Sequence, residues 1–355
     1  MMMKLKNLKK LATIGALISA LTGMGKANTT TNAVEETDLF VGTVKDIALA
    51  NKQFLITSDD AVMNGVPVKL MSTDMNTFSQ TTFAAGDTNQ LLFTNKVSGL
   101  AYDADSTNAW YGLEGKHELL GNMDVSQLAI SSVSCRHSAE IPPAHRFSEF
   151  PSPVLAAKDG YLWLSFIDSE DDILGVTKYR MDGNSNLVET AEALFSGKYF
   201  SKIYSSVTDG TGIWCATTDK EGQDRLVHLK PAHIGEVPDQ GDQNGVKASC
   251  GVAVLGEKVY GVSPDQTKLV QFSKDLNSHL GTVDLASKVS AIASDGAHVF
   301  AAAENGHEIY KVSPEDTVQT IVLDRAKTEP LKKIIVDNDT IYGATDRSFL
   351  RTKSR

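Results

Sequence analysis

Short apolar runs separated by tight polar turns recur along this chain. Each copy begins with a run of small and apolar residues, passes through a polar turn and continues into a second run that carries an aromatic side chain. Clear copies occupy residues 249–263, 289–303 and 331–345. Turns such as Asp-Gly and Asp-Asn suit two-residue hairpins. The pattern therefore predicts antiparallel hairpins repeated along the chain.

Four further copies bring the number of repeats to seven, at residues 44–57, 97–113, 152–166 and 203–217. Their aromatic side chains recur about every 48 residues. They are Phe54, Tyr111, Trp163, Trp214, Tyr260, Phe300 and Tyr342. A third alternating strand follows most copies and a fourth follows some, which is typical of a propeller blade. The sequence predicts an all-β, seven-bladed β-propeller; the alternatives are six or eight blades, or an ordinary two-sheet sandwich.

The last copy predicts how the ring closes. It ends almost at its third strand, residues 348–353, and has no outer strand of its own. Residues 38–43 precede the first copy and have no local partner. We expect this N-terminal strand to complete the last blade, because closure removes the free sheet edges that promote aggregation.

The first 27 residues have the pattern of a signal peptide. Residues 1–10 are basic, and residues 11–25 form an apolar stretch too short for a membrane span. Gly25 and Ala27 place small residues before a cleavage site after Ala27, with Ala20 as the alternative. The predicted organisation is a signal peptide (1–27), a flexible polar segment (28–37) and one propeller domain (38–355), in a periplasmic or secreted protein. The alternative is an uncleaved membrane anchor.

The negative charge lies entirely in residues 28–355. The formal net charge is −10, and residues 1–27 hold five lysines and no acid. After cleavage, 29 Lys and Arg would face 44 Asp and Glu, a net charge of −15. So acidic a protein is repelled by nucleic acid and by anionic membranes. We expect a monomer with no nucleic-acid partner and no membrane span after cleavage.

The three cysteines are Cys135, Cys215 and Cys250. An odd number leaves at least one free thiol. Cys215 and Cys250 fall in adjacent repeats and form the candidate disulfide, which an oxidising compartment would permit. The alternative is that both are small buried apolar residues.

The seven copies resemble the generic blades of extracytoplasmic bacterial propellers, in the broad group with YVTN-like and NHL-like repeats. The resemblance spans residues 38–353 and rests on the strand–turn–aromatic pattern. The Gly-His…Trp-Asp signature of WD repeats, the Gly-Gly pair of kelch repeats and a Cys-x-x-Cys-His haem site are absent from the sequence. The resemblance implies a fold, leaves the function open and indicates no specific cofactor.

The first strand of each blade lines the central channel of a propeller, so we aligned these strands on their turns. The aligned position is mostly small: Gly99, Ser205, Gly251 and Ala291. Such residues suit strands crowded around an axis. Asp46 and Lys333 are the charged exceptions, in the first and last copies, which are neighbours after closure. They predict a channel ion pair that either fixes the ring or, with Ser205 as a further candidate, anchors a polar ligand or a metal.

The longest irregular segment, residues 135–151, should be a strand 4-to-1 loop on the face that commonly carries ligands. It contains the candidate ligand-binding residues Arg136, His137 and His145. Cys135 and the two histidines could chemically bind zinc, but their spacing matches no known ligand pattern. We therefore predict a surface lid and no metal site.

A repeat scaffold without a catalytic motif favours a non-enzymatic role. The chain has no Gly-x-Ser-x-Gly elbow, P-loop or dinucleotide fingerprint. We expect an exported binding or scaffold protein whose loop-bearing face holds a protein, a peptide or a small polar ligand. The alternative is a lactonase-like, metal-dependent hydrolase with an axial site. That enzyme needs several oxygen or nitrogen ligands from different inner strands, and Asp46 is the only acid aligned there.

Overall fold

The computed structural model describes residues 28–38, 43–50, 53–63, 66–74, 80–84, 96–102, 108–114, 120–124, 153–168, 172–181, 187–195, 199–231 and 239–355. Within these ranges the chain folds into β-strands and one short 3₁₀ turn, η1 (Ala248–Cys250). No helix of the described chain is long and apolar enough to cross a membrane.

The strands form successive antiparallel sheets in chain order. The first sheet contains β2 (Val44–Ala50), β3 (Gln53–Met63), β4 (Val66–Asp74) and β5 (Gln80–Ala84). The second contains β6 (Lys96–Tyr102), β7 (Asn108–Glu114) and β8 (Leu120–Asp124). The third contains β9 (Val154–Lys158), β10 (Tyr161–Asp168), β11 (Ile173–Met181) and β12 (Leu187–Leu194).

The second half of the chain repeats the same arrangement. The fourth sheet contains β13 (Phe200–Thr208), β14 (Ile213–Asp219), β15 (Asp224–Lys230) and β16 (Asp239–Asn244). The fifth contains β17 (Ala253–Leu255), β18 (Lys258–Val262), β19 (Lys268–Ser273) and β20 (His279–Asp284). The sixth contains β21 (Val289–Ser294), β22 (Val299–Ala303), β23 (Glu308–Val312) and β24 (Val318–Asp324). The seventh contains β25 (Lys333–Asp337), β26 (Thr340–Ala344) and β27 (Ser348–Lys353).

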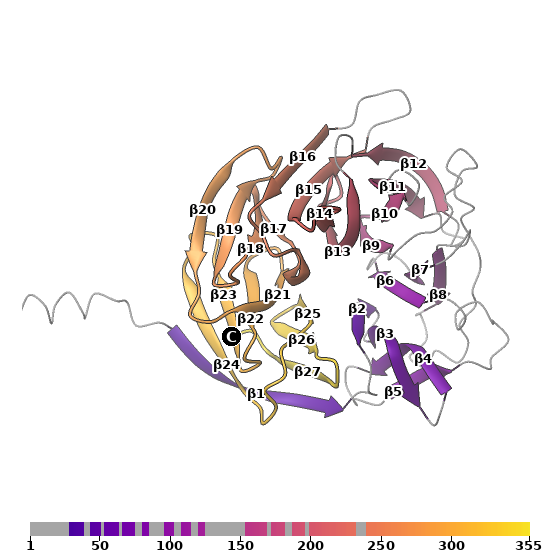
Figure 1. Cartoon of the computed structure of the whole chain (residues 1–355). Coiled ribbons are helices and arrows are strands. Elements are labelled where there is room, and N and C mark those ends of the chain that lie inside the picture. The colour runs from indigo at the N-terminus through magenta and orange to yellow at the C-terminus, as the bar shows by residue number, and fades with distance from the viewer. Residues whose placement is uncertain are drawn as a thin grey trace, which may run out of the picture.

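Figure 1 shows these sheets set around a central axis, with the first strand of each sheet innermost. The fold is a seven-bladed β-propeller, as the repeats predict. The aromatic side chains that mark the copies are all buried, and six of the seven lie in cores shared by two blades. Phe54, for example, stacks on Phe349 of the last blade with ring centroids 4.2 Å apart. Neighbouring blades therefore share apolar cores, and a single blade would leave its faces exposed.

The N-terminal strand closes the ring, but it lies earlier in the chain than the sequence predicts. The closing strand is β1 (Asn28–Asp38), and residues 39–42 of the predicted 38–43 segment lie outside the described ranges. Residues 28–33 pair in parallel with β24, and residues 34–38 pair antiparallel with β27 (Figure 1). The segment expected to be flexible thus bridges the last two blades. A polar segment can pair with two strands because the hydrogen bonds between strands are made by backbone groups and not by side chains.

Four inner strands, β2, β6, β13 and β21, share a local irregularity at the aligned residue. The pairing register shifts between Val44 and Asp46, and the same shift occurs just before Gly99, Ser205 and Ala291. The aligned residues therefore lie at one level of the channel. Crowding there is real, because a Cβ on Gly99 would stand 2.9 Å from the backbone oxygen of Pro153 in the next blade.

The candidate disulfide between Cys215 and Cys250 is not formed. Both cysteines are free and buried. Cys215 packs between the third and fourth blades, whereas Cys250 packs between the fifth and sixth. They behave as small apolar residues, the alternative interpretation of the sequence. Cys135 lies outside the described chain.

Candidate functional site: an axial cavity

A cavity of 630 Å³ lies on the propeller axis. Residues of six first-strand regions line it, from β2, β9, β13, β17, β21 and β25. Most of the lining belongs to the fourth to seventh blades. It runs from the level of Asp46, Ser205 and Lys333 to the hairpin turns that follow the inner strands, at Asp209 and Asp295.

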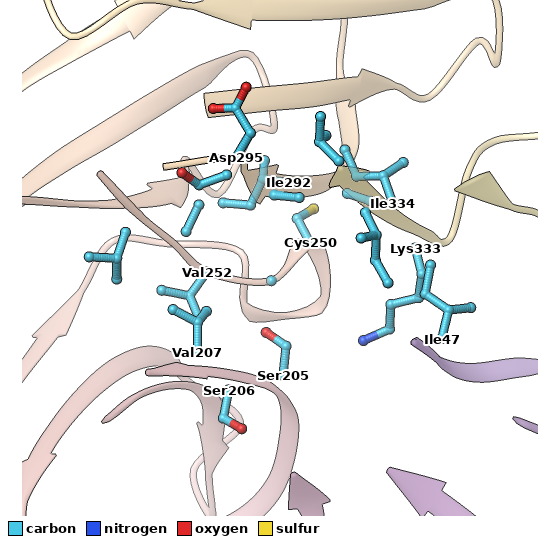
Figure 2. Close-up of a pocket in the computed structure, with 18 of the residues that line it drawn as sticks. Ile47, Ser205, Ser206, Val207, Cys250, Val252, Ile292, Asp295, Lys333 and Ile334 are labelled. Atoms are coloured by element: carbon cyan, nitrogen blue, oxygen red, sulfur yellow. The ribbon is translucent and has the colours of Figure 1, made fainter. Parts of the chain in front are cut away.

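Lys333 reaches across the channel. It starts β25 in the seventh blade, and its Nζ donates a hydrogen bond of 3.0 Å to the backbone oxygen of Tyr204 in the fourth blade. Figure 2 shows its ammonium end pointing into the middle of the cavity. An ammonium group has three N–H donors. The bond to Tyr204 uses one of them, so Lys333 retains donor capacity on the axis.

Asp46 lies beside this lysine but is held by backbone amides. Its Oδ1 accepts from the amide of Ile47 and its Oδ2 from the amide of Leu100, each at 2.9 Å. The second bond ties the first blade to the second. Loss of hydration raises the pKa of Asp46, while the charge of Lys333 and the two amide bonds lower it; on balance the pKa lies above its usual value.

Ser205 presents a buried hydroxyl without a partner. Its Oγ is inaccessible to solvent and has no hydrogen-bond partner among the described residues. The Ser205 Oγ lies close to Gly251, where an added Cβ would stand 3.3 Å from it. Gly251 has φ +94°, a conformation that favours glycine. In Figure 2 the Ser205 hydroxyl points into the cavity, whereas that of the neighbouring Ser206 points away.

The walls between this level and the turns are largely apolar. Val207, Val252, Ile292 and Ile334 line them and are labelled in Figure 2. Cys250 adds a thiol that lies 3.3 Å from the backbone oxygen of Val289. Burial raises the pKa of this thiol, which stays protonated at neutral pH.

Two aspartates stand where the cavity meets the turns. Asp209 accepts hydrogen bonds from the amides of Thr211 and Gly212 and pairs with Lys274 at 2.6 Å. Burial raises the pKa of Asp209, but the bond from Lys274 and those amides outweigh it, so the pKa lies well below its usual value. Asp295 caps its own turn by accepting from the amides of Ala297 and His298. Both carboxylates thus stabilise hairpin turns.

The structure brings together three of the six predicted site residues, Asp46, Ser205 and Lys333, at one cavity. Asp46 and Lys333 interact electrostatically, but Lys333 gives its hydrogen bond to Tyr204. The other three, Arg136, His137 and His145, lie outside the described ranges.

The sequence reasoning missed the Tyr204 carbonyl, the Cys250 thiol and the apolar walls. The walls could have been found by extending the inner-strand alignment a few residues toward the turns. A backbone carbonyl has no signature in a sequence. Within the described part of the chain, no group of three or more His, Cys, Asp or Glu side chains could hold a metal ion.

The comparisons with known proteins agree on the architecture. No protein-family model matches the chain, and no curated protein matches it in sequence. A streptogramin B lyase structure is similar with a TM-score of 0.60 and 12% identity, covering 91% of this chain and 98% of that one.

Two other propellers are similar to a comparable degree. A catalytically inactive virginiamycin B lyase from Staphylococcus aureus with quinupristin has a TM-score of 0.56 and 12% identity, covering 90% of this chain and 99% of that one. The WD40 domain of Neurospora crassa Pan2 has a TM-score of 0.61 and 8% identity, covering 88% of this chain and 90% of that one. At such identities the likeness shows the fold alone.

Proposed function

We propose that this chain is an exported binding protein that holds a small ligand in its axial cavity. The observation that carries the proposal is a lysine ammonium with spare donors beside an unpartnered buried hydroxyl, both in a cavity of 630 Å³. Cavities of this size that combine apolar wall segments with convergent polar groups are typical of small-molecule sites. The cavity is therefore favoured over the loop-bearing face, whose longest predicted loop lies outside the described ranges.

Binding without catalysis suits the groups present. The Asp46 carboxylate is engaged by two backbone amides, and the Cys250 thiol is buried with a raised pKa. Neither is poised as a base or a nucleophile. The proposed ligand is a small polar molecule, and the proposed state of the protein is monomeric.

Export is part of the same proposal, which also assigns the chain to the extracytoplasmic bacterial propellers with YVTN-like and NHL-like repeats. Asn28, the first residue after the predicted cleavage site, is also the first residue of β1. Cleavage after Ala27 would therefore leave the closing strand whole. N-terminal sequencing of protein from the periplasm or medium should begin at Asn28; a chain that retains residues 1–27 would contradict export by cleavage.

Native mass spectrometry tests the binding function. The native mass of protein purified without denaturation from its own source is compared with the denatured mass of the same sample. We expect a native excess on the order of a few hundred daltons, the size of a ligand that such a cavity holds, and its loss on denaturation. Equal masses would count against a resident ligand.

A further inference from the structure

The ammonium of Lys333 is the ionic group that reaches across the axial cavity, whose lining also contains Lys158 and Lys332. Its stem leaves β25, and its Nζ lies 3.0 Å from the Tyr204 oxygen, adjacent in sequence to Ser205. One donor is engaged there, and two remain for another acceptor. Hydrogen bonds from an ammonium to a carboxylate are shorter and stronger than bonds between neutral groups.

The Ser205 hydroxyl is a second donor at the same level. Ser205 lines the cavity but its Oγ is covered, so a ligand engages this donor by a small rotation of the side chain toward the axis. A buried hydroxyl without a partner costs free energy, and a ligand that accepts its hydrogen bond recovers that cost. Figure 2 shows the Ser205 oxygen and the Lys333 nitrogen both directed into the cavity. Two donors that converge on one space suit a group with two acceptor oxygens.

Asp46 does not offer the matching site for a cation. Each of its oxygens already accepts a backbone amide at 2.9 Å. Lys333 is also close enough to lower the pKa of Asp46 by its charge, so a second cation would be repelled from this level. The cavity lining holds three lysines and three aspartates, but all three aspartates already accept hydrogen bonds from backbone amides. The spare donors of Lys333 therefore favour an anionic group on the ligand.

We propose, building on the axial binding function, that the ligand is a small organic carboxylate whose carboxylate lies between Lys333 and Ser205. Its apolar body lies along Val252, Ile292 and Ile334 toward the hairpin turns. This arrangement gives the orphan hydroxyl a partner and covers the apolar walls.

Three eight-carbon probes test the assignment. Octanoate, octanol and octylammonium share one chain and differ in the end group. Isothermal titration calorimetry on the mature protein should show one saturable site for octanoate, with at least about tenfold weaker binding of the other two. Equal or tighter binding of octylammonium or octanol, or no binding of octanoate, would overturn the proposal.

Matched variants locate the site. K333M should weaken octanoate binding by about tenfold or more, and S205A by about threefold or more. K332Q and S206A are the controls. Both residues also line the cavity, but Lys332 faces Asp346 at 3.8 Å and the Ser206 hydroxyl points away in Figure 2. Circular dichroism on each variant verifies that it is folded. Equal losses in the control pair would overturn the assignment to Lys333 and Ser205.

A gain of binding separates the site from a folding defect. D46N removes the negative charge beside Lys333, so octanoate should bind about threefold or more tightly at neutral pH. Weaker binding by D46N would contradict the charge arrangement. The carboxylate proposal can fail while the proposed binding function holds. A resident ligand without a carboxylate, identified from the native mass, would overturn the carboxylate proposal and still support ligand binding in the axial cavity.

Discussion

Arg325 holds Glu36 through two nitrogens, although 289 residues separate them in the chain. The Nε and Nη2 atoms lie 3.2 and 2.5 Å from the carboxylate oxygens. The guanidinium is 1% exposed and also donates to the backbone oxygens of Gly306 and Glu329. This pair joins β1 to the last two blades and so fixes the closed ring.

Loss of Arg325 should therefore destabilise the whole domain. R325M removes the guanidinium from the mostly buried Glu36 and leaves it with Ser348 and the more distant Lys327. We expect a loss of about 3 kcal/mol in the free energy of unfolding. The matched control is R347M, whose pair with Glu329 is exposed and should matter by no more than about 1 kcal/mol. Urea denaturation of both variants measures the difference. Equal effects would mean that closure does not depend on the Glu36 pair.

The same pair predicts an acid-dependent loss of stability. Burial raises the pKa of Glu36, but the hydrogen bonds from Arg325 and Ser348 and the charge of Arg325 outweigh it, so the pKa lies below its usual value. The contribution of Glu36 is then complete above the pKa of the unfolded chain and is lost as the pH falls through the folded pKa. The stability gap between the native chain and E36Q should narrow below pH about 4.5. A stability difference between the native chain and E36Q that does not change with pH would contradict the lowered pKa of Glu36.

The stability that Asp46 contributes should depend on pH in the opposite direction to that of Glu36. Its pKa is raised, chiefly by loss of hydration, so its stabilising contribution is complete below the unfolded pKa and is lost as the pH rises through the folded one. D46N does not ionise. Relative to the native chain, it should therefore gain stability between about pH 4 and pH 7. Denaturation at three pH values across this interval measures the trend, and a relative loss would show that ionised Asp46 is stabilised in the fold.

The buried thiols should resist alkylation in the folded protein. Burial raises the pKa of Cys215 to about 12, and the weak contact with Ser165 only partly offsets it. Iodoacetamide should label Cys215 and Cys250 only after unfolding, because the reactive form is the thiolate. Peptide mapping before and after denaturation reads each site separately. Labelling of Cys215 in the native protein would show that its blade interface opens, and labelling of Cys250 would show that its thiol is reached from the axial cavity.

The repeats were visible in the sequence because each blade needs the same parts: a small inner strand, a tight turn and an aromatic residue between blades. Closure was predicted from the missing outer strand of the last copy, but it was placed at 38–43. The observed strand, β1, is polar, and its side chain Glu36 bonds Arg325, which is 289 residues away. No local pattern links residues so far apart in the chain.

The candidate site was likewise predictable only in part. Asp46, Ser205 and Lys333 emerge from an alignment of the inner strands on their turns, and a register shift precedes both Asp46 and Ser205. The Tyr204 acceptor and the unpartnered state of the Ser205 hydroxyl did not, because they depend on how opposite blades face each other across the axis. Spacing along the chain carries no information on that distance.

A crystal structure of the mature protein with octanoate tests the central claim most directly. We expect the octanoate carboxylate within hydrogen-bond distance of Lys333 Nζ and Ser205 Oγ, with its chain along the apolar walls. An empty axial cavity at a saturating concentration, or octanoate bound elsewhere on the protein, would contradict the account.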